Sequence, residues 1–306
     1  MAVIVGRILR SVYLMNRVSV TIAIVAAVLM VVAVLVWVNR PRRVIIEAPL
    51  PPAFPEQGFS HANLERLLGE YVSPQGRVDY ARWHDSRESV EQLDQYLVAV
   101  SRFSPDSTPQ RFPDRNAELA YWLYGYNAYV IKAVLDNWPL SSVTDVKAPV
   151  EAIRGMGFFH QLRFSFGGEY LSLLAAENRK IRARYRDARI HFVLNCASES
   201  CPVARPELPT GDELEELMTT AAAEFVNDTD NVSVDHGSRS VYLNTIFKWY
   251  KKDFINDLRA QGRPTGRGLI DYVAVHADGD LVADLARADG YRIEFRDYDW
   301  SLNAAR

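Results

Sequence analysis

The chain has 306 residues, of which 48% are hydrophobic and 24% charged, a composition typical of globular proteins. Its formal net charge of −3 is unevenly distributed, because residues 1–43 contain six arginines and no acid, leaving 29 basic against 38 acidic side chains in the remainder. This acidic remainder argues against nucleic acid as a partner, since phosphate binding requires basic surface. Two cysteines are too few for a fold that is held together by several disulfides, but they could form one disulfide.

Residues 18–38 form an uncharged stretch rich in Val, Ala, Ile and Leu. As a helix it would be roughly 31 Å long, about the thickness of the hydrocarbon core of a membrane. The stretch is longer than the apolar region of a cleaved signal peptide, and no clear small-residue cleavage site follows it. We therefore expect a single-pass anchor in the inner membrane, so that the membrane is one partner of the chain.

The orientation of this anchor is nearly balanced by charge. Three arginines precede it and three follow it closely: Arg7, Arg10, Arg17, Arg40, Arg42 and Arg43. The free amino terminus adds one positive charge to the first side, which favours the amino terminus inside and the large domain outside. A cytoplasmic domain tethered to the membrane is the alternative.

The rest of the chain predicts one α+β domain, with a helical amino-terminal half packed on a small mixed sheet. Residues 1–17 are a short leading segment, 39–58 a Pro/Arg-rich extended linker, and 59–306 the domain. Apolar spacing predicts helices over residues 60–71, 87–101, 115–136, 172–185, 210–227, 246–254, 268–276 and 280–288. The helix over 115–136 is apolar on nearly all sides, which indicates the buried central helix.

Strands are expected in two hairpins, in one buried segment and at the end of the domain. The hairpins cover residues 162–171, turning at two glycines, and 232–243, turning at His236-Gly237. Residues 189–195 have the length and β-branched or aromatic character of a buried strand, and 291–295 predict a final strand. A capping box formed by Thr210 and Glu213 would begin the helix that ends near residue 227.

The segment Arg189–Pro202 is the strongest candidate for a functional site. Its predicted strand ends in a polar loop that holds both cysteines, Cys196 and Cys201. If the strand stays extended, the five residues from His191 to Cys196 span roughly 16 Å. A direct pair of these two side chains therefore requires the chain to fold back after Leu194.

Cys196 is the candidate nucleophile, because a thiol becomes reactive when a helix amino terminus, a cation or an imidazole lowers its pKa. His191 is the nearest base in sequence, and His160 or His236 could supply one from another element. A buried structural role is an equal alternative for His191, and a surface position is one for His160.

Two further polar residues are catalytic candidates. Asn127, in the apolar central helix, would either tie that helix to neighbouring backbone or orient a base or substrate carbonyl. Glu177 could orient a histidine or act as an acid, although a solvated glutamate is the commoner role for such a position.

The spacing of the two cysteines leaves three interpretations open. A small disulfide loop between Cys196 and Cys201 would stabilise the fold by about 2 kcal/mol. A thiol nucleophile is the second interpretation, and redox cycling or metal binding is the third. The spacing matches neither the thioredoxin motif nor a standard zinc site, and no phosphate loop is present, so we expect no metal and no cofactor.

Several segments together resemble the domain-of-unknown-function family 547 over roughly residues 60–260. They are residues 121–128, 158–159, 168–173, 177–178, 190–202 and 249–254. The resemblance implies no established activity. Bacterial members of the family are commonly envelope proteins with a signal or anchor, and some eukaryotic members have a neighbouring glutaredoxin domain.

The family motifs match this chain at Asn127, Glu177, His191, Cys196, Ser198 and Cys201. Cys201 is the less secure of the two cysteines, because many eukaryotic relatives lack it. Ser198, Cys201 and His160 are candidate binding residues. Ala197 replaces an expected glycine, which puts a positive φ at that position in doubt.

Three functions follow from these residues, and the sequence does not decide whether the chain is an enzyme. The first is an envelope-facing, thiol-dependent hydrolase or transferase acting on peptide-like substrates, with Cys196 as the nucleophile. The second is a non-catalytic binding or assembly module for a peptide or envelope protein, rigidified by a Cys196–Cys201 disulfide. The third is a thiol–disulfide oxidoreductase.

Overall fold

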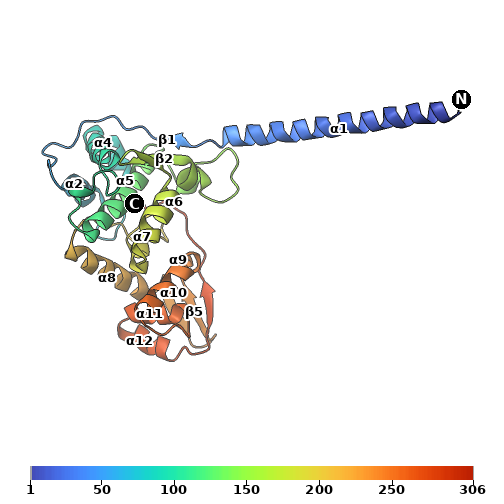
Figure 1. Cartoon of the computed structure of the whole chain (residues 1–306). Coiled ribbons are helices and arrows are strands. Elements are labelled where there is room, and N and C mark those ends of the chain that lie inside the picture. Colours follow the sequence, from blue (N-terminus) through green and yellow to red (C-terminus); the bar gives the residue numbers. More distant parts are fainter. Residues whose placement is uncertain (1, 306) are drawn as a thin grey trace.

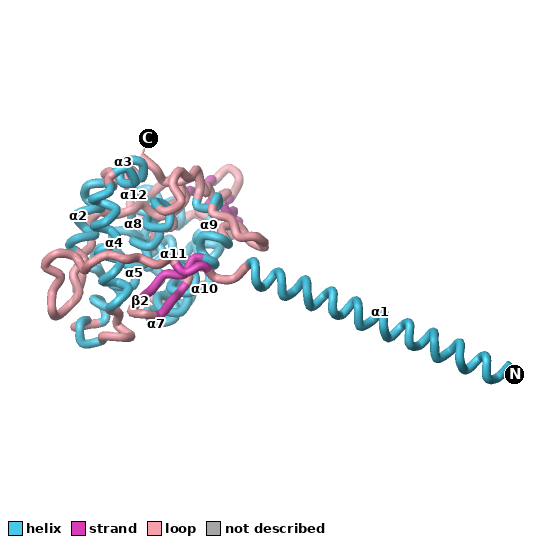
Figure 2. Tube along the Cα trace, turned by 90° about the horizontal axis from the view of Figure 1, so that it is seen from above, coloured by secondary structure: helices cyan, strands magenta, loops and turns pink. Residues whose placement is uncertain are grey.

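The computed structural model describes the backbone of residues 2–305 and the side-chain surroundings of residues 20–305. Helix α1 (Ala2–Val38) projects away from a globular body formed by the rest of the chain (Figures 1 and 2). Within it, Val20–Val38 is long and apolar enough to cross a membrane and is not buried against the body. Length and composition of this kind suit either a membrane span or a signal sequence.

The first half of the body is helical, as its apolar spacing predicts. Helix α5 lies at its centre, buried along almost its whole length, and the side chain of Asp114 caps its first turn by accepting a hydrogen bond of 2.8 Å from the Ala117 amide. The elements are α2 (Ala62–Tyr71), α3 (Tyr80–Asp85), α4 (Arg87–Arg102), η1 (Pro109–Arg111), α5 (Arg115–Leu135), η2 (Val143–Asp145) and the π-helical turn η3 (Gly157–Gln161).

A first three-stranded sheet joins this half to the linker. Its order is β1-β2-β3, with β1 (Arg42–Arg43) parallel to β2 (Leu162–Phe166) and β3 (Glu169–Leu171) antiparallel to it. The predicted hairpin is thus present with its glycine turn. Gly167 has φ of 57°, and a Cβ atom there would lie 2.1 Å from Ser104 Oγ, so only glycine fits. The linker packs on the domain, because one of its residue pairs forms β1.

The next segment begins with α6 (Leu173–Ala176) and ends with α8 (Asp212–Asn227). Between them lie the π-helical turn η4 (Glu177–Arg182), α7 (Ala183–Tyr185) and η5 (Ala188–Phe192). The capping box predicted for α8 is wrong: Gly211, with φ of 61°, precedes the helix, and no side chain caps it.

The carboxyl-terminal part contains a second three-stranded sheet of order β4-β5-β6. Its middle strand β5 is labelled in Figure 1. β4 pairs antiparallel with β5, and β5 pairs parallel with β6. The elements are β4 (Val232–Asp235), β5 (Ser240–Leu243), α9 (Thr245–Trp249), α10 (Lys251–Ala260), α11 (Leu269–His276), α12 (Gly279–Ala286) and β6 (Arg292–Phe295). The domain is therefore α+β, with two small mixed sheets where one was expected.

Candidate functional site

The strand predicted over residues 189–195 is wrong, and this correction shapes the whole site. Residues 188–192 form the short 3-10 helix η5, which starts where the Asp187 side chain accepts a hydrogen bond of 2.9 Å from the Arg189 amide. The amides of Val193 and Leu194 donate to the Ile190 carbonyl at 3.1 and 3.0 Å. The chain therefore folds back, and His191 and Cys196 line one cavity instead of pointing apart along a strand.

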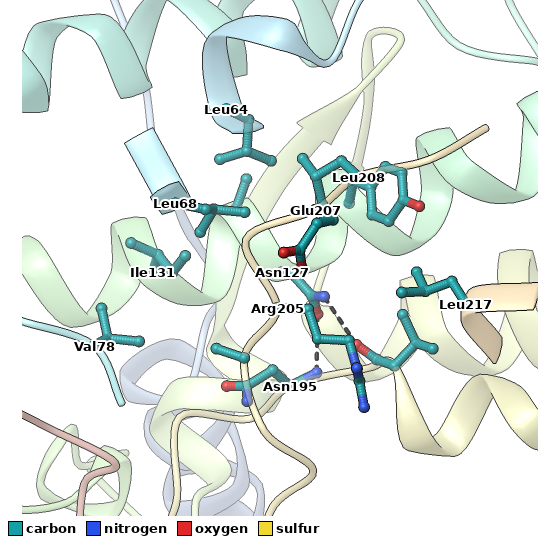
Figure 3. A pocket seen from close by; sticks show the side chains of 14 residues that line it. Leu64, Leu68, Val78, Asn127, Ile131, Asn195, Arg205, Glu207, Leu208 and Leu217 are labelled. Atoms are coloured by element: carbon teal, nitrogen blue, oxygen red, sulfur yellow. Dashed lines mark hydrogen bonds between the residues drawn. The ribbon is translucent and has the colours of Figure 1, made fainter. Parts of the chain in front are cut away.

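Asn127 holds this turn to the central helix. Its Nδ2 donates to the Val193 carbonyl at 3.0 Å, and its Oδ1 accepts from the Asn195 amide at 2.9 Å (Figure 3). These two bonds replace the backbone pairing that a strand would have supplied. Asn127 thus ties the helix to neighbouring backbone, the structural role the sequence favoured. Beside it is a cavity of about 30 Å³ with mainly aliphatic walls, which contains neither cysteine.

Asn195 shapes the loop that follows. Its Oδ1 accepts a hydrogen bond from the Ala197 amide at 2.8 Å, and its Nδ2 donates to the Pro202 carbonyl at 2.6 Å. Ala197 has φ of 59° and is fully buried. The doubt about a positive φ at this alanine is therefore resolved in favour of the turn, because the Asn195 side chain closes it from inside.

Cys196 and His191 lie on the walls of a cavity of about 50 Å³. The cavity has room for more than one water-sized group. Cys196 is partly exposed, whereas His191 and Cys201 are buried. The walls consist of the two cysteines, one histidine, one carboxyl, aromatic rings and a few others: Tyr126, Glu177, His191, Leu194, Asn195, Cys196, Cys201, Ile246, Trp249, Tyr250 and Tyr298.

The two thiols are free and differ in their surroundings. Burial raises the pKa of the Cys196 thiol, but hydrogen bonds from Cys201, Tyr298 and Ser198 outweigh it, so that its pKa is lowered. Burial and the neighbouring Cys196 raise the pKa of Cys201 well above the ordinary value. Cys201 Sγ accepts a hydrogen bond of 2.8 Å from the Cys196 amide. Cys196 is therefore the thiol with the greater thiolate character.

His191 is held by a carboxylate that the sequence did not single out. Its Nε2 lies 2.9 Å from Asp253 Oδ2, and the Tyr250 ring stacks on the imidazole with 3.8 Å between ring centroids. Burial lowers the pKa of His191 despite Asp253, which favours a neutral imidazole. Arg182 Nε donates to the same carboxylate oxygen at 2.7 Å. No hydrogen bond joins His191 to Cys196 in the described part of the chain.

Glu177 contributes a buried carboxyl to the same cavity. It lies at the start of η4, its exposed fraction is 5%, and its Oε1 has no hydrogen-bond partner among the described residues. Burial raises its pKa, opposed by the Tyr250 hydroxyl and by Arg182. The alternative of a solvated surface glutamate is therefore wrong.

The end of the chain covers the cysteine loop. Tyr298 Oη lies 2.9 Å from Cys196 Sγ. The Glu199 amide donates to the Ser301 carbonyl at 2.8 Å, and the Asn303 amide donates to the Ala197 carbonyl at 3.2 Å. Residues 297–305, hereafter the terminal strap, therefore both fix the loop and place a hydroxyl on the thiol.

The other candidates lie outside the cavity. His160 is in η3, and burial lowers its pKa. His236 contacts Tyr291 and Asp284 at the far hairpin. Ser198 is buried, and its Oγ donates to the Cys196 carbonyl at 3.4 Å. Among the described residues, no group of three or more His, Cys, Asp or Glu side chains could hold a metal ion.

Sequence reasoning missed Asp253, Tyr298 and Tyr126 as site residues. Asp253 belongs to the segment 249–254 that resembled the family, so a signal was present, but Asp253 was not named as a candidate site residue. Tyr126 lay inside the apolar central helix, where a tyrosine is ordinary. Tyr298 had no signal, because only the tertiary course of the terminal strap brings it to Cys196.

Fold and site define an α+β domain that follows an apolar amino-terminal helix. Its cavity is lined by two free thiols and by a buried histidine, which is held by a partly exposed carboxylate. Residues 109–226 match the family described as "Protein of unknown function, DUF547", which supports the resemblance of the domain to this family. The match includes Asn127, Glu177 and the segment from His191 to Cys201, and ends before Asp253 and Tyr298. No curated protein and no solved structure matches the chain.

Proposed function

We propose that this protein is a thiol-dependent acyl hydrolase or transferase acting on peptide-like substrates, with Cys196 as the nucleophile. The observation that carries the proposal is the shared cavity of Cys196 and His191, in which Asp253 holds the imidazole and Tyr298 contacts the thiol. Nucleophile, base and orienting carboxylate are the three parts of a cysteine hydrolase site. Catalytic hydrogen bonds often tighten only when substrate binds, so the missing bond between His191 and Cys196 does not exclude the pair.

The reaction would proceed in two balanced steps. The Cys196 thiol passes its proton to His191 and its sulfur forms a bond to the acyl carbon, while the carbonyl electron pair moves onto oxygen. The carbonyl re-forms, the leaving group departs with the proton from His191, and a thioester remains. Water or an acceptor then attacks the thioester, His191 removes the proton, and the Cys196 thiolate leaves.

The proposal is tested by trapping the thioester. Purified protein is incubated with p-nitrophenyl acetate and intact mass is recorded over time, followed by peptide mapping. We expect one acetyl group on Cys196, none in Cys196→Ser, and at least tenfold slower acetylation in His191→Asn, whereas Cys201→Ser remains acetylated. Equal acetylation of Cys196 and Cys201, or no effect of His191→Asn, would exclude this mechanism.

The contact between the two cysteines favours thiol–disulfide exchange as a second candidate. Cys196 would attack a substrate disulfide, form a mixed disulfide and release one substrate thiol. Cys201 would then attack Cys196, release the second thiol and leave a Cys196–Cys201 disulfide. Cys201→Ser distinguishes the candidates, because it would trap a mixed disulfide with a glutathione-disulfide probe but leave acetylation unaffected. A disulfide-rigidified binding module predicts instead that neither thiol reacts and that both serine variants unfold at lower temperature.

We also propose that the apolar helix anchors the domain in the inner membrane and that the domain faces the cell envelope. The hydropathy of Val20–Val38 supports an anchor, and the one extra positive charge before it, from the free amino terminus, supports an extracytoplasmic domain. Carbonate extraction and protease treatment of spheroplasts test this. The chain should stay in the membrane fraction at full length, and its body should be degraded from outside. Release as a shortened soluble protein would indicate a cleaved signal sequence instead.

A further inference from the structure

The buried carboxyl group of Glu177 costs folding free energy, and the proposed mechanism does not use it. Its carboxyl group is buried, and Oε1 lacks any hydrogen-bond partner among the described residues. A buried acceptor without a partner costs free energy, so such a group is retained when something else supplies the donor. Arg182, the cation that lowers the pKa of Glu177, is engaged elsewhere, because its guanidinium donates to Asp253 and Asn178. A group that enters the cavity from outside could supply the donor that this one oxygen lacks.

The aromatic side chains that line the cavity beside Glu177 indicate which kind of hydrogen-bond donor would bind there. Tyr126, Tyr250 and Tyr298 line the same cavity, and Trp249 lies at its solvent side with 47% of its surface exposed. Aromatic faces around one carboxylate attract a small cation, because the ring quadrupole and the negative charge act together. A carboxylate substrate would instead be repelled by Glu177. The cavity of about 50 Å³ has room for a small ammonium group.

We infer that Glu177 and the surrounding tyrosines bind a free ammonium group of the substrate, and that the substrates are aminoacyl compounds. Because Glu177 and Cys196 line one small cavity, that ammonium lies within a few bonds of the carbonyl that Cys196 attacks. This inference rests on the proposed function for its reaction, but the ammonium site itself depends only on the cavity. Glu177 is then a specificity residue, whereas His191 and Asp253 serve the chemical step.

The experiment measures protection of Cys196 from iodoacetamide by small ligands, with intact mass spectrometry as the readout. The probe is glycinamide, and the matched neutral probe is N-acetylglycinamide. Glycinamide should slow alkylation in a saturable way, and N-acetylglycinamide should not. In Glu177→Gln the half-protecting concentration of glycinamide should rise at least tenfold. Glu216→Gln, which removes an exposed glutamate on α8, should leave it unchanged.

The outcomes separate this inference from the proposed function. Equal protection by the neutral probe, or unchanged protection in a folded Glu177→Gln variant, overturns the ammonium site even if p-nitrophenyl acetate acetylates Cys196. Ammonium-selective protection without any acetylation supports the site and excludes the acyl-transfer function. Titration calorimetry of glycinamide with Cys196→Ser provides a binding measurement that does not depend on thiol reactivity, and an absence of heat there also overturns the inference.

Discussion

The Tyr298 hydroxyl is, after Cys201, one of the groups that lower the pKa of Cys196 against burial. Because this hydroxyl stabilises the thiolate at 2.9 Å, Tyr298→Phe should raise the pKa of Cys196. The pH profile of iodoacetamide alkylation, followed by mass spectrometry, should then move to higher pH, whereas Tyr242→Phe on β5 should not move it. An unchanged profile in Tyr298→Phe would show that the hydroxyl does not stabilise the thiolate.

The ionisation of Asp253 makes the stability of the folded protein depend on pH in the acid range. Burial raises the pKa of its carboxyl, but His191 and Arg182 outweigh burial and lower it to about 2 from 3.8. A carboxyl group whose pKa is lower in the folded state than in the unfolded state stabilises the native protein at pH values above the unfolded-state pKa. This contribution is lost as the pH falls through the folded-state pKa. Asp253→Asn should therefore weaken stability at neutral pH and flatten its fall between pH values of about 4 and about 2. Thermal unfolding followed by circular dichroism measures both, and an acid limb as steep as that of wild type contradicts the assignment.

At the scale of elements, the turn that follows η5 depends on one side chain of α5. Asn127→Ala leaves the Val193 carbonyl and the Asn195 amide buried without partners, which should cost about 2 to 4 kcal/mol. Urea unfolding measures this cost, and slower alkylation of Cys196 should accompany it as the turn loosens. Asn137→Ala, at the end of the same helix, should cost less than about 1 kcal/mol. Equal costs for the two variants would show that Asn127 does not hold the turn.

The helix η5 shows which part of the structure could not be predicted from the sequence. Helix α5, both hairpins and most helix starts follow from apolar spacing, caps and glycine turns, all of which are local. The residues of η5 instead have the β-branched and aromatic character of a strand. Asp187 bonds the backbone at the start of η5, and Asn127 bonds the backbone just after its end. Such side-chain partners override local propensity. The site residues Cys196, His191 and Glu177 could be named from sequence, but their meeting in one cavity could not.

On the scale of the whole molecule, the terminal strap joins the distant parts of the site. The backbone of the strap forms hydrogen bonds with the cysteine loop and with Val78. Removing the strap would therefore expose the cysteine loop and Val78. Deleting residues 297–306 should lower the thermal midpoint by several degrees and abolish the difference in alkylation rate between Cys196 and Cys201. Differential scanning fluorimetry and peptide mapping measure the two effects. A truncated protein with wild-type stability and unchanged thiol selectivity would show that the strap is dispensable.

The limits of the family match explain why the partners of His191 and Cys196 could not be predicted from the sequence. The match contains the thiols and His191, whereas the carboxylate that holds the imidazole and the hydroxyl on the thiol lie beyond residue 226. These partners come from α10 and the terminal strap, which meet the matched segment only through tertiary folding. Contacts of this kind leave no periodic pattern, so neither could be identified from the sequence alone.

The most direct test of the central claim is a competition between the two thiols of one molecule. Native protein is alkylated with a limiting amount of iodoacetamide near neutral pH, and the label on Cys196 and Cys201 is quantified by peptide mapping. The account predicts rapid labelling of Cys196, which is partly exposed and has a lowered pKa, and very slow labelling of Cys201. Equal labelling of both thiols, or labelling of neither until the protein is reduced, would contradict it.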